Sequence, residues 1–167
     1  CGEWRPARRK RPGWSITAAA DRMQAIHSSP YAGTWYPEDP AELERLLDVL
    51  FERSSERTGA CTLANPLGFV VPHAGLVYSG AVAAGAYRMI AQDPPRRIVL
   101  LGFAHRGGPR AVAIPEVERI GTPLGEVAVD LAAAAKLAGH QPFQIVPERR
   151  VCDHSVEIQL PLLIKAA

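Results

Sequence analysis

Two short apolar runs of this chain each end at a histidine: residues 67–75 read Leu-Gly-Phe-Val-Val-Pro-His-Ala-Gly, and residues 98–105 read Ile-Val-Leu-Leu-Gly-Phe-Ala-His. Short apolar runs of this kind are typical of strands buried in a parallel sheet. Parallel strands present their carboxyl ends at one edge of the sheet, where open α/β folds bind ligands. The pattern therefore predicts that His73 and His105 lie together as a metal-binding or active-site pair.

Helical and strand patterns elsewhere place these runs in an α/β unit. Apolar residues with helical spacing predict a helix over residues 40–53, and an alanine-rich stretch predicts another over residues 81–91. With strands at residues 67–72 and 97–101, the second helix completes a right-handed parallel crossover. Further strands are expected at residues 111–114, 126–129 and 143–146, and further helices at residues 130–138 and 155–167.

The composition fits one folded domain preceded by a basic segment. The chain has 167 residues, of which 47% are hydrophobic and 22% charged, enough for one ordinary core and one domain, or part of a larger one. Residues 1–22 hold six basic and two acidic side chains, a net charge of +4, which leaves −2 for residues 23–167. We interpret residues 1–22 as a basic, disordered leader or a gene-prediction extension, and residues 23–167 as the domain.

Composition also argues against several classes of protein. The basic tract lacks the interleaved aromatic side chains that stack on bases, so no nucleic-acid partner is expected. No apolar stretch is long enough to span a bilayer, so no membrane partner is expected either. Three cysteines without a C-x-x-C pair cannot form a complete disulfide framework, which indicates a reducing compartment, the cytoplasm.

The two histidines that follow the apolar runs are the first candidates for chemistry. A neutral imidazole binds zinc, copper, iron or nickel. Pro72 fixes the backbone before His73, Gly75 leaves room after it, and Gly102 opens the loop that carries His105. The alternative for each histidine is an ordinary loop residue that makes hydrogen bonds.

A third candidate lies in the segment Asp-His-Ser-Val-Glu at residues 153–157. His154 precedes an expected helix and could donate a proton, contact substrate or support a metal ligand, whereas the alternative is local capping. Glu157 falls in the first helical turn, where capping explains a carboxylate. Cys152 could be a thiolate ligand, but a buried, inert cysteine is the more common case. Two further histidines are expected at the surface: His27 and His140.

Five motifs follow one another along residues 28–162. They are Tyr-Ala-Gly-Thr-Trp-Tyr-Pro at 31–37, Val-Pro-His-Ala-Gly-Leu-Val-Tyr-Ser-Gly at 71–80, Leu-Leu-Gly-Phe-Ala-His at 100–105, Thr-Pro-Leu-Gly-Glu-Val-Ala-Val-Asp at 122–130, and Asp-His-Ser-Val-Glu-Ile-Gln-Leu-Pro at 153–161. In this order they resemble the successive motifs of the Memo-like family, whose bacterial and archaeal members include AmmeMemoRadiSam system protein B. Five ordered motifs are far more specific than any single histidine.

The resemblance implies an α/β fold similar to the LigB-type class III extradiol dioxygenases, with three layers and a mostly parallel central sheet. It implies that His73 and His105 are metal ligands and that His154 borders the same pocket, where we expect it to be catalytic. Where many relatives have Gly-Pro-Ser-His, this chain has Gly-Phe-Ala-His at residues 102–105. Because relatives are considerably longer, we also expect a domain incomplete at its carboxyl end, with the third metal ligand beyond residue 167.

A complete site of this kind would suit iron or copper and the activation of oxygen, so we predict a metal-dependent oxidoreductase with dioxygenase-like chemistry. The alternative is a non-enzymatic module that binds a peptide or small molecule in the same pocket through Trp35, Tyr36 and Tyr78. A weaker alternative is metal-assisted hydrolysis with Glu157 or His154 as the base. By family resemblance, the partners would be radical SAM and AMMECR-type proteins of the same system.

Overall fold

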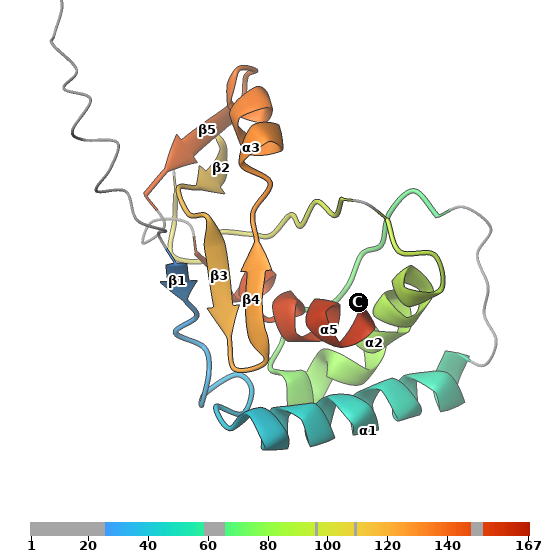
Figure 1. Cartoon of the computed structure of the whole chain (residues 1–167). Coiled ribbons are helices and arrows are strands. Elements are labelled where there is room, and N and C mark those ends of the chain that lie inside the picture. Colours follow the sequence, from blue (N-terminus) through green and yellow to red (C-terminus); the bar gives the residue numbers. More distant parts are fainter. Residues whose placement is uncertain (1–25, 59–65, 96, 109, 148–151) are drawn as a thin grey trace, which may run out of the picture.

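The computed structural model of the chain describes residues 26–58, 66–95, 97–108, 110–147 and 152–167. These residues combine helices with strands, so the expected α/β class is confirmed (Figure 1). The helices are α1 (Pro40–Thr58), α2 (Leu76–Gln92), α3 (Leu131–Ala138), α4 (His154–Glu157) and α5 (Gln159–Ala166). The strands are β1 (Ile26–Ser28), β2 (Val112–Pro115), β3 (Arg119–Thr122), β4 (Gly125–Ala128) and β5 (Phe143–Val146). The basic leader expected at residues 1–22 lies outside the described residues.

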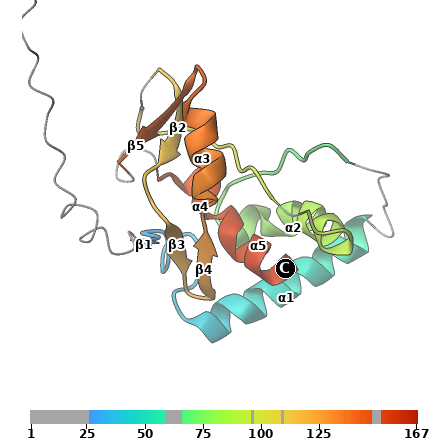
Figure 2. The ribbon, with the colours of Figure 1, turned by 45° about the horizontal axis from the view of Figure 1, so that its top comes forward.

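Helices α1, α2 and α5 pack together and enclose the main core (Figures 1 and 2). Helix α1 begins where the sequence predicts because the Asp39 side chain accepts a hydrogen bond of 2.8 Å from the Glu42 N–H. Its leucines at helical spacing turn toward the core, where Leu43, Leu47 and Leu50 are buried. The helix continues past its predicted end, to residue 58.

Helix α2 begins more than one turn before its predicted start at residue 81. The Leu76 N–H donates to the Trp35 carbonyl at 3.1 Å, which ties the start of the helix to the turn at residues 31–36. Gly80 faces α1, and a Cβ atom there would lie 2.6 Å from a methyl group of Leu50. Glycine at this position therefore lets the two helices approach closely.

The described strands form two small sheets in place of the single, mostly parallel central sheet that the resemblance implied. Strand β1 pairs parallel with β3, and β3 pairs antiparallel with β4 across a tight turn. Strand β2 pairs parallel with β5, against which α3 packs. The Asp130 side chain caps α3 by accepting a hydrogen bond of 2.9 Å from the Ala133 N–H. Strands β2, β4 and β5 and helix α3 lie close to their predicted positions.

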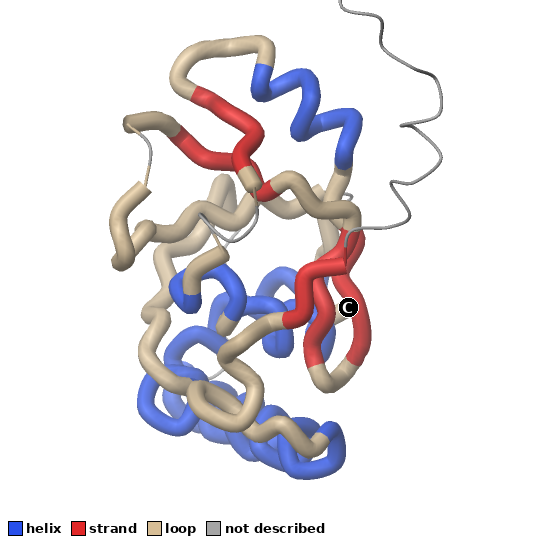
Figure 3. Tube along the Cα trace, turned by 90° about the vertical axis from the view of Figure 1, so that its left-hand side faces the viewer, coloured by secondary structure: helices blue, strands red, loops and turns tan. Residues whose placement is uncertain are grey.

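The two apolar runs at residues 67–72 and 97–101 are not strands, so the predicted parallel crossover is wrong. Both runs are loop segments that take no part in the ladders of the described sheets (Figure 3). Several of their apolar side chains are exposed: Leu67, Val70, Val99 and Leu101. An apolar run is buried only where a neighbouring strand or helix covers it, and here the cover is partial, because Val71 and Leu100 pack against core residues while their neighbours face outward.

The single helix predicted at residues 155–167 is divided into α4 and α5 at Ile158. Pro161 has no N–H to donate to the carbonyl four residues earlier, and its ring crowds that carbonyl, so a continuous helix is interrupted there. Of the helices in the described segments, none has both the length and the apolar character needed to cross a bilayer.

Candidate metal centre

Three histidines from distant parts of the chain converge on one point. His73 precedes α2, His105 follows the second apolar run, and His154 is the first residue of α4. Each offers a ring nitrogen, and these nitrogens all lie within 4.8 Å of one another. The ring centroids are separated by 5.3 Å for the pair His73 and His105 and by 4.3 Å for the pair His105 and His154. The predicted histidine pair is therefore brought together, although the strands expected to carry it are absent.

A side chain of α5 holds the loop that carries His73. The Gln159 side-chain amide on α5 donates to the Pro72 carbonyl at 3.1 Å. The same amide accepts a hydrogen bond of 3.1 Å from the Tyr87 hydroxyl, whose pKa is raised by burial, so that the phenol stays protonated. A buried chain of polar groups thus runs from α2 through α5 to the residue before His73.

His105 is held by the carboxylate of Asp153. The His105 backbone N–H donates to Asp153 Oδ2 at 3.1 Å, and the His105 ring Nδ1 lies 3.0 Å from Oδ1. Burial alone would raise the pKa of Asp153, but hydrogen bonds from Ser155 and His105 outweigh it and lower the pKa to about 2. The ionised carboxylate accepts a hydrogen bond from the Nδ1–H of His105, and in that tautomer of the neutral ring Nε2 carries the lone pair that can bind a metal.

His154 stacks on the indole of Trp35. The ring centroids are 4.1 Å apart with an angle of 24° between the planes. Burial, together with the neighbouring imidazoles of His105 and His73, lowers the pKa of His154 in spite of the nearby Asp153 carboxylate. At neutral pH the ring is therefore uncharged, the form that binds a metal or accepts a proton.

The loop that carries His105 is clamped against α4. The Phe103 N–H donates to Ser155 Oγ at 3.0 Å, and the same hydroxyl donates to the Phe103 carbonyl at 2.9 Å. A Cβ atom on Gly102 would lie 2.4 Å from Ser155 Oγ and 2.5 Å from a methyl group of Val156. Glycine at residue 102 is thus required for the contact that places His105 beside His154.

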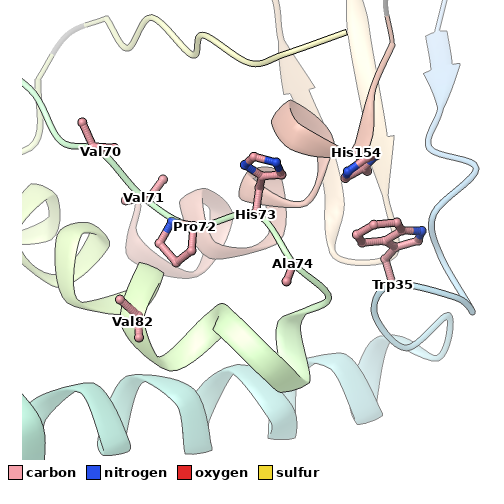
Figure 4. Close-up of a pocket in the computed structure, with 8 residues that line it drawn as sticks. All are labelled: Trp35, Val70, Val71, Pro72, His73, Ala74, Val82 and His154. Atoms are coloured by element: carbon pink, nitrogen blue, oxygen red, sulfur yellow. The ribbon is translucent and has the colours of Figure 1, made fainter. Parts of the chain in front are cut away.

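An open hollow of about 720 Å³ adjoins the histidines. His73, His154 and Trp35 form one end of it, and Val70, Val71 and Val82 form the other (Figure 4). Eight residues line the hollow: Trp35, Val70, Val71, Pro72, His73, Ala74, Val82 and His154. Polar groups are confined to the histidine end, so an apolar or aromatic group could lie along the valines with its reactive end at the imidazoles.

One residue that organises the site escaped sequence reasoning. Asp153 organises the cluster, and the available signal was an aspartate directly before His154 at the start of a helix, where it caps α4 by accepting from the Ser155 N–H. Of the three aromatic residues proposed for ligand contact, Trp35 alone lines the hollow. Tyr36 is buried and donates to Ser29 at 2.8 Å.

The profile of the Memo-like protein family matches residues 28–167, which include all three histidines of the cluster. The chain belongs to the Memo-like family. It is similar to a MEMO1 family protein of Aquifex aeolicus, with 33% identity over 144 residues that make up 85% of this chain and 51% of the relative. The MEMO1 family protein MK0963 of Methanopyrus kandleri is 35% identical over 147 residues, 81% of this chain and 50% of the relative.

Memo-like relatives also include the memo-1 homolog of Caenorhabditis elegans, which is 30% identical over 139 residues, 83% of this chain and 38% of the relative. The chain therefore spans about half the length, or less, of these curated relatives. The family membership holds for the part of the fold that carries the histidine cluster.

Proposed function

We propose that the histidine cluster, His73, His105 and His154, binds iron or copper and that this Memo-like chain takes part in a metal-dependent oxidation there. The single observation that carries the proposal is the convergence of three imidazole nitrogens within 4.8 Å. Imidazole suits both metals. When bound, either metal supplies one-electron and dioxygen chemistry.

In this proposal His73 and His105 are the metal ligands and His154 is the acid–base residue. The carboxylate of Asp153 supports the ligand role of His105, because it orients the ring through Nδ1 and leaves Nε2 available. The lowered pKa of His154 supports its role, because a neutral imidazole can accept a proton from a substrate. Stacking on Trp35 holds this ring in position without occupying its nitrogens.

The hollow supports an apolar or aromatic substrate. Its walls away from the histidines come from valine, proline and alanine side chains. A ring or an alkyl group placed there would lose contact with water, while a polar substituent could reach the His73 and His154 rings. The Glu157 carboxylate is paired with His27 in β1 and does not line this hollow. This placement argues against Glu157 as the base of a metal-assisted hydrolysis.

The second candidate is a binding module without catalysis, which uses the same hollow for a peptide or small molecule. The apolar walls and the indole of Trp35 favour it, since both suit ring stacking and side-chain burial. The two candidates differ in their dependence on metal and oxygen. If a peptide or small molecule binds equally well in the presence of a chelator, and no oxygen is taken up, the non-catalytic binding module is favoured.

Metal titration of the purified chain tests the proposal. Iron(II) under anaerobic conditions, and copper(II) separately, should fill the histidine cluster of the wild-type chain with one equivalent, and that equivalent should be lost in His73→Ala and His105→Ala. The matched control is His140→Ala, which removes an exposed histidine outside the cluster. Equal affinity in all four proteins would show that the cluster does not bind the metal.

A further inference from the structure

A second group of metal-ligating side chains lies outside the histidine cluster. It consists of His27 in β1, Cys152 just before α4, and Glu157 at the end of α4. The ring nitrogen, sulfur and carboxylate oxygen that these residues offer all lie within 4.8 Å of one another. His27 was expected at the surface, but its side chain is only 13% exposed because it packs against Glu157.

The carboxylate of Glu157 is the unusual member of this group. Its side chain is 1% exposed, and Oε1 lies 3.0 Å from His27 Nε2. Within the described segments, the other oxygen, Oε2, is buried without a hydrogen-bond partner. A buried carboxylate oxygen without a partner is costly, and native structures usually satisfy such an atom with a donor, a water or a cation.

The three ligand types together fit one metal. A thiolate, an imidazole and a carboxylate are all ligands that Zn²⁺ takes in tetrahedral sites, with water as a fourth ligand. Tetrahedral zinc holds such ligand atoms about 3.4–3.8 Å apart, and the ligand atoms of this group all lie within 4.8 Å of one another, so small side-chain shifts would bring them onto one ion. Binding would also release the thiol proton of Cys152 to solvent.

We infer that His27, Cys152 and Glu157 form a second metal site that takes Zn²⁺, distinct from the histidine cluster. The ion would satisfy the buried oxygen of Glu157 and join β1 to the segment 152–157. That segment also carries Asp153 and His154 of the histidine cluster, so the second site would hold their backbone in place. The alternative is a metal-free hydrogen bond between His27 and Glu157, with Cys152 engaged in contacts of its own.

Cobalt(II) distinguishes the two sites by their colour. A thiolate bound to Co²⁺ gives an intense sulfur-to-metal charge-transfer band in the near ultraviolet, which a site of histidines alone cannot give. The experiment uses the full chain with His73→Ala and His105→Ala, so that the histidine cluster does not compete for cobalt. The expected result is a thiolate band that saturates at one equivalent and is bleached by Zn²⁺.

Single changes in this background locate the ligands. Cys152→Ser should abolish the band, and His27→Ala should weaken cobalt affinity by about 100-fold or more, because losing a ligand costs more than the 10–100-fold typical of an outer partner. The control Cys61→Ser, which removes a cysteine other than Cys152, should leave the band unchanged. A band that persists in Cys152→Ser, the absence of any band, or unaltered affinity in His27→Ala would each overturn the inference.

Discussion

Gly102→Ala should loosen the loop that carries His105 and weaken metal binding without removing a ligand. The added methyl group would lie 2.4 Å from Ser155 Oγ and 2.5 Å from a Val156 methyl group, and no atom pair of this kind tolerates such distances. Ser155 is buried and its hydroxyl both donates to and accepts from Phe103, so it cannot turn aside without breaking two hydrogen bonds.

The size of the effect follows from these contacts. Two hydrogen bonds contribute about 0.5–1.5 kcal/mol each. Overpacking at a close contact costs about 1–3 kcal/mol more. The free energy of unfolding should therefore fall by about 2–6 kcal/mol, a large part of the stability of a small domain.

Urea unfolding, followed by circular dichroism, measures the stability, and iron(II) titration measures the site. Gly68→Ala is the matched control, because no atom lies within 4 Å of the added methyl group. A Gly102→Ala protein that unfolds within 0.5 kcal/mol of wild type, or that binds metal with unaltered affinity, would refute the placement of this loop against α4.

Three further outcomes can be checked on the same preparations. Leu47→Ala should lower the free energy of unfolding by about 2–5 kcal/mol, because the side chain is fully buried between α1 and α2, whereas the exposed Val49→Ala should change it little. The backbone N–H of Ala133 holds the pKa of Asp130 below its usual value, so this carboxylate stabilises α3 at neutral pH and loses that effect as the pH falls below about 4. On acidification, the loss of the circular dichroism signal should therefore be smaller in Asp130→Ala than in wild type, because the contribution from protonation of Asp130 is missing. The exposed side chains of Leu67 and Val70 should make the chain self-associate, and Val70→Lys should reduce that association in light scattering because it places a charge within the exposed apolar run.

Sequence reasoning located the elements whose signal is local. Helix α1 has leucines at helical spacing and an aspartate cap, and β5 was predicted at its exact bounds. Strands β1 and β3 were missed because each is short and neither sequence, Ile-His-Ser nor Arg-Ile-Gly-Thr, is an apolar run. Their pairing depends on contacts between segments that are far apart in the chain, which a local pattern does not contain.

In the candidate site, too, local patterns predicted some features, while others depend on contacts between distant segments. The proximity of His73 and His105 was predicted from the apolar runs, yet the structure achieves it through Asp153 and the loop clamp rather than through paired strands. His27 was placed at the surface because its partner, Glu157, lies 130 residues later. A contact between residues so far apart in the chain produces no periodic pattern in the sequence of either segment.

The order in which the chain leaves the ribosome has a consequence for the histidine cluster. His73 and His105 are synthesised well before Asp153, which lies 48 residues beyond His105, and before Gln159, which lies 87 residues beyond Pro72. Until those residues emerge, both imidazoles belong to segments without their anchoring partners. The earlier histidines must therefore remain unassembled until α4 and α5 have been synthesised, and the centre closes only when these helices dock.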